Sequence, residues 1–187
     1  AGSVPVVQIP AGYELRAYRP GDEAGWAEVL AAAGFADWTT QRCRDYMQEP
    51  TRRRGSHLVA CAGQAVSVTF ATPDAHDAAA GHLDYVATAP DHRGRRLGRA
   101  VCAAVMRFFL AEGRSTIRLA TDDWRLPAIA VYLALGFEPV MTRLDMPGPI
   151  HSLNVSNACV LALYVVRRAI GPGASMPPVA PPGPLGD

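Results

Sequence analysis

A short segment rich in arginine and glycine, residues 93–98, has the residue types of an anion-binding turn. It reads Arg-Gly-Arg-Arg-Leu-Gly and lies between an apolar run that ends at Thr88 and an amphipathic stretch, 99–111. Because glycine lacks a side chain, the backbone turns sharply at Gly94 and Gly98 and a ligand can approach it closely. The first N–H groups of a following helix have no acceptor within that helix and lie at the positive end of its dipole. The pattern therefore predicts a strand, a tight turn and a helix start that bind an anion, best a phosphate.

Four arginines surround this turn, and guanidinium is the side chain that best matches phosphate oxygens. They are Arg93, Arg95, Arg96 and Arg99. The turn differs from a P-loop because no Gly-Lys-Ser/Thr follows, and it lacks the G-x-G-x-x-G of dinucleotide-binding proteins. These differences disfavour a nucleotide triphosphatase and a dinucleotide enzyme. The alternative interpretation is a solvated basic turn that only caps a helix.

Residues 93–98 resemble the pyrophosphate-binding motif of the GCN5-related N-acetyltransferase (GNAT) family, Arg/Gln-x-x-Gly-x-Gly/Ala. One position departs, since Arg96 stands where the family has its central glycine. An arginine there needs either a negative φ or a turn that absorbs the strain of a positive one, about 1–2 kcal/mol for a non-glycine residue. The resemblance implies that the pyrophosphate of a coenzyme lies on the backbone of Arg93, Gly94, Arg95, Arg96, Leu97, Gly98 and Arg99.

A second motif follows one helix and one strand later. Residues 128–137 resemble the GNAT pattern Asn-x-x-Ala-x-x-Leu-Tyr-x-x-x-Gly-Phe, with Arg125 at the asparagine position and Val131 in place of the leucine. In that family a tyrosine at the position of Tyr132 lies near the thioester sulfur and protonates the departing thiolate. The resemblance also implies that Arg125 and Ala128 contact the coenzyme. The alternative for Tyr132 is a tyrosine that only packs its ring and hydrogen-bonds its hydroxyl.

Two polar residues on the expected strand 82–88 are candidates for a general base. His82 and Asp84 lie two residues apart, so on a strand they face the same side. An amine must lose a proton before it attacks a thioester, and a carboxylate on this strand serves as base in several GNAT members. Asp84 is therefore the first candidate and His82 the second, with a surface-facing polar pair as the alternative. The resemblance further implies that the pantetheine arm binds the strand backbone, where the sheet splits open, at Val86, Ala87 and Thr88.

Aromatic and acidic residues near these motifs are candidates for shaping the acceptor pocket. If Asp122 or Asp123 lines it, a cationic amine is favoured by charge. The alternatives are that the aromatic residues belong to the core and that the aspartates make a turn. The full set is Trp38, Tyr46, Tyr85, Asp122, Asp123 and Trp124.

Composition agrees with one catalytic domain and a tail. The chain has 187 residues, of which 49% are hydrophobic, which is enough for a substantial core. A net charge of +1 disfavours a nucleic-acid partner, and the second basic cluster, 52–54, is expected to be a solvated loop. The longest apolar run, 158–166, is shorter than the roughly 20 residues that span a bilayer, so no membrane partner is expected. Four cysteines without a CxxC pair predict neither a metal site nor a disulfide framework, and they favour the cytoplasm.

The order of predicted elements indicates an α/β (α+β) fold with a mixed central sheet of about six to seven strands flanked by helices. Read along the chain it is β-α-α-β-β-β-α-β-α-β-β, the order of the GNAT fold. The expected strands are 15–19, 57–62, 65–72, 82–88, 116–121 and a closing pair within 137–146, with Gly63-Gln64 joining the second and third. The expected helices are 23–33 with Asp22 as cap, 38–48, 98–111 and 128–135.

Four regions are predicted along the chain. Residues 1–12 form an N-terminal extension, and residues 13–146 form the GNAT-like domain. Residues 147–170 add a C-terminal segment with a helix at 152–170, which either covers the core, mediates a homodimer or closes over the acceptor. Residues 171–187 form a tail that is too rich in proline and glycine to pack a core, so it is expected to be disordered.

The resemblance implies an N-acetyltransferase that moves an acetyl group from acetyl-CoA directly to a primary amine of a small molecule or peptide, without a metal. A non-catalytic acyl-CoA-binding module is one alternative, because Arg96 and Arg125 depart from the motifs. A nucleic-acid-binding module built on the arginine-rich turn is another.

Overall fold

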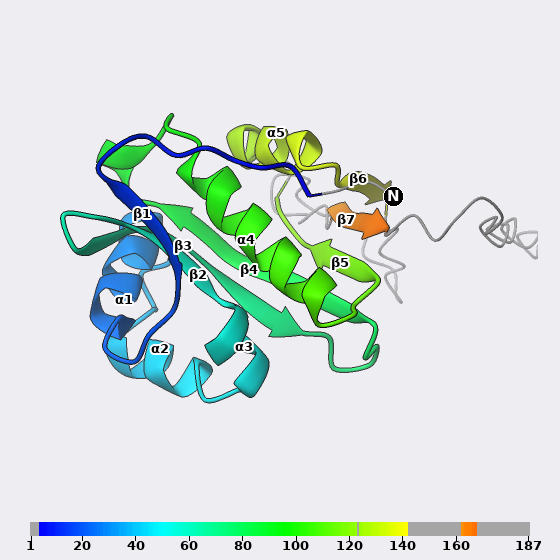
Figure 1. Cartoon of the computed structure of the whole chain (residues 1–187), viewed down its shortest axis with the longest axis horizontal. Coiled ribbons are helices and arrows are strands. Elements are labelled where there is room, and N and C mark those ends of the chain that lie inside the picture. Colours follow the sequence, from blue (N-terminus) through cyan, green and yellow to red (C-terminus); the bar gives the residue numbers. More distant parts are fainter. Residues whose placement is uncertain (1–3, 123, 142–161, 168–187) are drawn as a thin grey trace, which may run out of the picture.

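Seven described strands form one mixed sheet in a computed structural model that describes residues 4–122, 124–141 and 162–167 (Figure 1). The spatial order is β1-β2-β3-β4-β5-β7-β6. Among the described strands only β4 and β5 pair in parallel, and every other neighbouring pair is antiparallel. The predicted mixed sheet of six to seven strands is therefore confirmed. The strands are β1 (Tyr13–Ala17), β2 (His57–Cys61), β3 (Gln64–Pro73), β4 (Ala80–Thr88), β5 (Thr116–Leu119), β6 (Glu138–Met141) and β7 (Ala162–Arg167).

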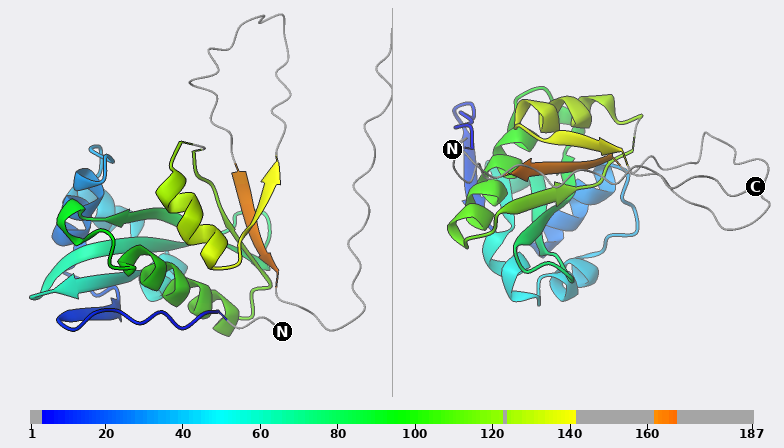
Figure 2. Two further views of the ribbon diagram at one scale, coloured as in Figure 1. Left: turned by 90° about the horizontal axis from the view of Figure 1, so that it is seen from above. Right: turned by 90° about the vertical axis from the view of Figure 1, so that its right-hand side faces the viewer.

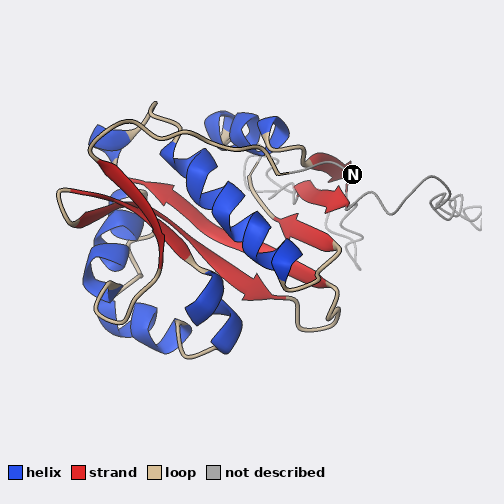
Figure 3. Cartoon of the chain, viewed as in Figure 1, coloured by secondary structure: helices blue, strands red, loops and turns tan. Residues whose placement is uncertain are grey.

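Helices cover both faces of this sheet (Figures 2 and 3). On one face, the long helix α4 buries Phe109 against Ile117 of β5, and α5 packs into the same cluster. On the other face, α1 buries Trp26 against Phe70 of β3, next to α2. The described helices are α1 (Glu23–Ala32), α2 (Thr40–Tyr46), α3 (Pro50–Gly55), α4 (Leu97–Ala111) and α5 (Leu126–Ala134), with a short 3-10 turn η1 (Pro90–His92).

The basic cluster 52–54 lies on a helix, α3, so the predicted loop there is wrong. The Glu49 carboxylate accepts hydrogen bonds from the backbone N–H groups of Thr51 (2.9 Å) and Arg52 (2.7 Å). Pro50 occupies the first turn, where its missing N–H is not needed. This capping pattern was visible in the sequence and explains why a short basic segment is helical.

Two smaller expectations also differ from the structure. The β2–β3 turn is made by Ala62 and Gly63, both with positive φ (49° and 81°), one residue earlier than predicted. Asp22 does stand at the start of α1 but does not cap it with its side chain. Its carboxylate instead pairs with the Arg16 guanidinium at 2.7 Å.

The C-terminal helix predicted at 152–170 is wrong for residues 162–167, which form β7 between β5 and β6. Arg118 of β5 pairs with Val165, and Val140 of β6 pairs with Leu163. The segment Ala-Leu-Tyr-Val-Val-Arg is rich in residues that favour strands, and in this position it gives both neighbouring strands a partner. The sheet therefore continues past residue 146, and β7 is the second strand of the closing pair. Residues 142–161 and the tail 171–187 lie outside the described residues.

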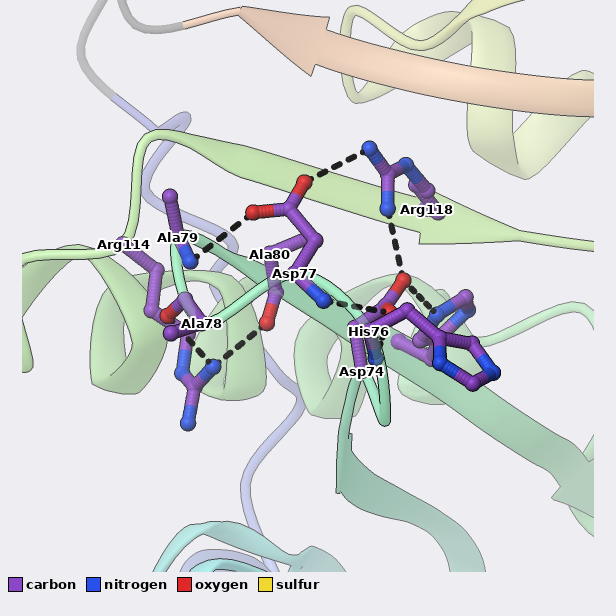
Figure 4. Close-up of polar contacts among 9 residues, drawn as sticks. Asp74, His76, Asp77, Ala78, Ala79, Ala80, Arg114 and Arg118 are labelled. Carbon is purple, nitrogen blue, oxygen red and sulfur yellow. Dashed lines mark hydrogen bonds and ion pairs between the residues drawn. The ribbon is translucent and has the colours of Figure 1, made fainter.

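One carboxylate in the β3–β4 loop connects the two parallel strands (Figure 4). Asp74 Oδ2 accepts hydrogen bonds from His82 Nε2 of β4 (2.8 Å) and from the Arg118 guanidinium of β5 (2.6 Å). Its other oxygen accepts the N–H of His76 at 2.9 Å. Asp77 adds a second contact to Arg118 at 2.8 Å. These bonds hold β4 and β5 together at His82 and Arg118, the last pair of residues before the two strands separate.

Acid titration tests the contribution of Asp74. The hydrogen bond from the His76 N–H, together with His82 and Arg118, lowers the pKa of the Asp74 carboxyl well below its usual range. A lowered folded-state pKa stabilises the fold above the unfolded value, about 3.9, and this stabilisation is lost as the pH falls through the folded pKa. We therefore expect Asp74→Asn to unfold at lower urea concentration than the wild type at pH 7, with a smaller difference at pH 2.5.

Asp45→Asn, which changes an exposed carboxylate on α2, is the control and should leave stability nearly unchanged at both pH values. A difference between wild type and Asp74→Asn that is equal at pH 7 and pH 2.5 would contradict the role of the ionised carboxylate.

Candidate functional site

A bulge interrupts β4 next to the site. Two β4 residues, Tyr85 and Val86, face a single β3 residue, Thr69. Tyr85 has a φ of 51°, the left-handed region that side chains other than glycine rarely adopt. The Thr69 hydroxyl donates to the Asp84 carbonyl oxygen at 3.0 Å and so stabilises the distorted backbone. Bulges of this kind bend a strand and stop its regular pairing.

Strands β4 and β5 separate beyond His82 and Arg118, the two residues that Asp74 bonds, and leave a space between them. Their pairing runs only from Ala80 and Thr116 to His82 and Arg118. A cavity of about 350 Å³, here called the strand cavity, is lined by residues 83–86 on one side and 120–122 on the other. The parallel strand pair β4–β5 is therefore open at the end where β4 carries its bulge.

A second cavity of about 460 Å³, here called the turn cavity, is lined by the end of β4 and by the turn that precedes α4. The two cavities share part of their lining, so they meet. Tyr132, which is only 5% exposed, lies at this junction. The shared residues are Phe35, Val86, Arg125, Ala128 and Tyr132.

The sequence left two conformations open for Arg96, and the turn adopts the strained one, with a positive φ. Arg96, the residue before α4, has φ 63° and ψ 16°, so the left-handed conformation is present although the residue is not glycine. The first backbone bond of α4 runs from the Ala100 N–H to the Arg96 carbonyl at 3.0 Å. The amides of residues 97–99 therefore come before the first helical hydrogen bond and are available to an anion.

The arginines around the turn have different surroundings. Arg99 lines the turn cavity and donates to the Ala134 carbonyl at 2.9 Å, while its Nε is buried without an acceptor among the described residues. Arg93 donates to the Thr88 carbonyl at 3.2 Å. Arg95 bonds the carbonyl of Asp91 and does not line either cavity. Arg99 therefore brings a guanidinium group to the turn cavity, and guanidinium suits an anionic ligand.

Most residues predicted for the coenzyme gather around the turn cavity. Arg95 is the exception in that set. Those that line it are Val86, Ala87, Thr88, Arg93, Gly94, Arg96, Leu97, Gly98, Arg99, Arg125 and Ala128, and Tyr132 joins them.

The two candidate bases are placed differently. Asp84 lines the strand cavity, and its Oδ2 accepts a hydrogen bond from the Tyr46 hydroxyl at 3.2 Å. His82 lines neither cavity and instead binds Asp74. Geometry therefore favours Asp84 over His82 as a group that reaches a bound acceptor.

The strand cavity carries two carboxylates and one guanidinium. Asp122 lines it together with Asp84 and forms an ion pair with Arg125 at 2.9 Å. Arg125 also lies over the rings of Phe35 (5.0 Å) and Trp124 (4.8 Å), which fixes its plane. Since the pair with Asp122 neutralises Arg125, the charge that remains in the cavity lining is that of Asp84.

Some lining residues were missed in the sequence. His92 lines the turn cavity, and its Nδ1 is hydrogen-bonded to the Tyr13 hydroxyl of β1 at 2.9 Å. Its place directly before residues 93–98 was a usable signal. Phe35 follows the glycine that ends α1, and no local pattern marks it as part of a cavity.

Two classes of feature are absent from the part of the chain that the structure describes. There, no three histidine, cysteine, aspartate or glutamate side chains lie close enough together to hold a metal ion. None of the described helices combines the length and the apolar character that crossing a membrane requires.

Comparison with known proteins gives consistent results. The model of the acetyltransferase (GNAT) family matches residues 23–137. A mycothiol acetyltransferase from Thermobispora bispora is 31% identical over 146 residues, which cover 72% of this chain and 49% of the relative. Another from Streptomyces bingchenggensis is 32% identical over 149 residues, covering 75% of this chain and 48% of the relative. The chain thus spans about half the length of the curated relatives it matches.

Solved structures share the fold at low sequence identity. Diaminobutyrate acetyltransferase from Paenibacillus lautus, in complex with L-2,4-diaminobutyric acid and coenzyme A, has a TM-score of 0.64 at 15% identity and covers 83% of this chain and 94% of its own. A GCN5-related N-acetyltransferase from Kribbella flavida has a TM-score of 0.61 at 19% identity and covers 84% and 97%, respectively.

Replacing the strained arginine with glycine should stabilise the protein. Arg96→Gly relieves a positive φ, which costs about 1–2 kcal/mol, but it adds freedom to the unfolded chain, so a net gain of about 0.5–1 kcal/mol is expected in urea unfolding. Arg95→Gly is the control, because Arg95 does not have a positive φ, and it should lower stability. Equal losses of stability in both variants would show that Arg96 is not strained.

Proposed function

Because the chain belongs to the GNAT acetyltransferase family, we propose that it transfers an acetyl group from acetyl-CoA directly to a primary amine of a small molecule or peptide. The observation that carries this proposal is the meeting of two cavities at Tyr132. One cavity has unpaired amides and arginines suited to phosphate, and the other has a carboxylate suited to an amine. A thioester at the junction would lie within reach of both.

The coenzyme fits the turn cavity by charge and by hydrogen bonding. Its pyrophosphate would bind the amides of residues 97–99 and the guanidinium of Arg99, which lines the cavity. Its pantetheine arm would run along the bulged end of β4, residues 86–88, where no β5 backbone competes for the strand's hydrogen bonds. The acetyl group would then reach the junction of the two cavities.

The reaction needs no covalent enzyme intermediate, since both substrates are held side by side. An amine in the strand cavity gives up a proton toward Asp84, and its nitrogen attacks the thioester carbonyl carbon. When the tetrahedral intermediate collapses, the carbon–sulfur bond breaks and the sulfur takes a proton from the Tyr132 hydroxyl. The nitrogen loses its second proton, which returns to the Tyr132 phenolate through solvent, and Asp84 releases the first proton to solvent. The products are an amide and coenzyme A with a free thiol.

The acceptor is expected to be a cationic amine, because the strand cavity retains the negative charge of Asp84 after Asp122 pairs with Arg125. The relatives' name makes a mycothiol precursor with a free amine the first acceptor to assay. Thiol release should be measured with that compound and with a panel of 1,4-diaminobutane, spermidine, glucosamine and a peptide with a free amino terminus. If acetyl-CoA bound but no acceptor led to thiol release from it, the protein would instead be a binding module.

Substitution of Gly98 tests the coenzyme site. Gly98→Glu places a carboxylate beside the expected pyrophosphate, and we expect calorimetry to show at least a hundredfold loss of acetyl-CoA affinity. An added Cβ alone meets only ordinary contacts, with Thr88 Oγ1 at 3.4 Å, so the fold should tolerate the change. Gly98→Gln has the same size without the charge and should bind more tightly than Gly98→Glu. Unchanged affinity in the glutamate variant would rule out the turn as the pyrophosphate site.

Substitution of Tyr132 tests the proton donor. Tyr132→Phe keeps the buried ring and removes the hydroxyl, so kcat should fall about tenfold to a hundredfold while the Kd of acetyl-CoA stays within about twofold. Steady-state thiol release and calorimetry measure the two quantities. If kcat remained at the wild-type value, thiolate departure would not depend on this hydroxyl.

A further inference from the structure

A chain of polar side chains leads from helix α3 to the proposed base. The Tyr46 hydroxyl lies 3.2 Å from Asp84 Oδ2 and 3.3 Å from Thr72 Oγ1. Thr72 Oγ1 in turn lies 3.3 Å from Arg52 Nε. The four residues come from α3, β3, α2 and β4, so the fold brings them together from distant parts of the sequence.

The direction of hydrogen bonding along this chain follows from chemistry. A guanidinium only donates, and an ionised carboxylate only accepts. Arg52 must therefore donate to Thr72, which leaves the Thr72 hydroxyl hydrogen for the Tyr46 oxygen and the Tyr46 hydrogen for Asp84. Bonds that run in one direction polarise one another, so each strengthens the next.

Packing fixes Tyr46 in the position from which it donates. The Arg52 guanidinium lies 3.7 Å from the centre of the Tyr46 ring, and it also donates to the Tyr46 carbonyl at 3.5 Å. Phe70 and Trp38 contact the ring edge-on, at centroid distances of 4.8 Å and 5.1 Å. Phe70 is fully buried, so the Tyr46 ring cannot move without disrupting the core.

We propose that Arg52, Thr72 and Tyr46 are positioning residues that orient the Asp84 carboxylate toward the acceptor amine. Tyr46 holds Oδ2 and leaves Oδ1, which has no partner among the described residues, to meet the amine in the strand cavity. The inference rests on the proposed function, because it assigns the device to the base of that reaction. Helix α3, the segment expected to be a solvated loop, would thus contribute Arg52 to the site.

The contact between Tyr46 and Asp84 can be tested without an acceptor. Burial, together with the nearby Asp84 charge, raises the pKa of Tyr46. Phenolate absorbance at 295 nm, measured as wild type minus Tyr46→Phe, isolates the Tyr46 transition from those of the other tyrosines. In Asp84→Asn, measured against its own Tyr46→Phe background, that transition should move by about half a unit or more to lower pH.

Asp45→Asn is the matched control, since it removes an exposed charge from the same helix without touching the Tyr46 hydroxyl, and its transition should equal that of the wild type. A Tyr46 transition at the same pH in wild type and Asp84→Asn would overturn the contact, and with it the proposal.

The consequence for catalysis is tested with the panel amine that gives the fastest thiol release. Tyr46→Phe should lower kcat about tenfold and leave the Kd of acetyl-CoA within about twofold. Thr72→Val, which has the same shape and no hydroxyl, should lower kcat in the same direction. In an Asp84→Asn background Tyr46→Phe should add less than a further twofold loss, because both act through one carboxylate.

If Tyr46→Phe lowered kcat by the same factor in the wild type and in Asp84→Asn, Tyr46 would serve only the structure. That result would overturn the positioning proposal while leaving the proposed acetyl transfer intact. Conversely, full activity in Asp84→Asn would remove Asp84 as the base. If the Tyr46 transition shifts as expected but none of the amines supports thiol release, the contact would stand and the proposed reaction would be wrong.

Discussion

The bulge of β4 is the constraint on which the site depends. It places Tyr85 and Val86 opposite one β3 residue, and in this part of β4 the strand pairs with β3 but no longer with β5. The same two strands are held together at their other end by Asp74. A strand pair that is closed at one end and open at the other forms a wedge, in which one strand is proposed to bind the donor and the space beside it to admit the acceptor.

Strain is concentrated at this wedge. Tyr85 and Arg96 both have positive φ; Tyr85 directly precedes the strand segment where the coenzyme is proposed to bind, and Arg96 lies within the turn proposed for its pyrophosphate. Folded proteins retain such conformations where the surrounding structure enforces them, and they occur often at functional sites. Here Tyr85 packs among the aromatic rings beside β3, and Arg96 precedes a helix whose first turn is firmly buried through Leu97 and Val101. The packing of the two core layers thus supports the strained backbone from both faces of the sheet.

Local sequence patterns predicted the elements with strong local signals. The turn before α4 and the helix of Tyr132 are marked by glycine, proline and apolar spacing, and the sheet was confirmed with them. The α3 helix was missed because a run of arginines suggested solvent, although Glu49 and Pro50 supplied a capping signal. Strand β7 was mistaken for a helix because a short apolar run fits either element, and only its partners β5 and β6 decide between them.

The site was less accessible from sequence for a related reason. His82 and Asp84 share a strand and a predicted face. However, His82 is bonded to the loop carboxylate Asp74, whereas Asp84 lines the strand cavity. Phe35 and Arg52 come close to the site through tertiary packing, which spacing along the chain does not encode, whereas Tyr46 was among the residues expected near the acceptor.

Coenzyme A is proposed to bind along the bulged strand and across the turn before α4. Titration of ¹⁵N-labelled protein with coenzyme A, followed by amide chemical shifts, tests it most directly. The largest shifts should occur at residues 86–88 and 94–99, with little change at the Asp74 end of the sheet. Saturable binding that leaves those amides unmoved and shifts another surface would contradict it.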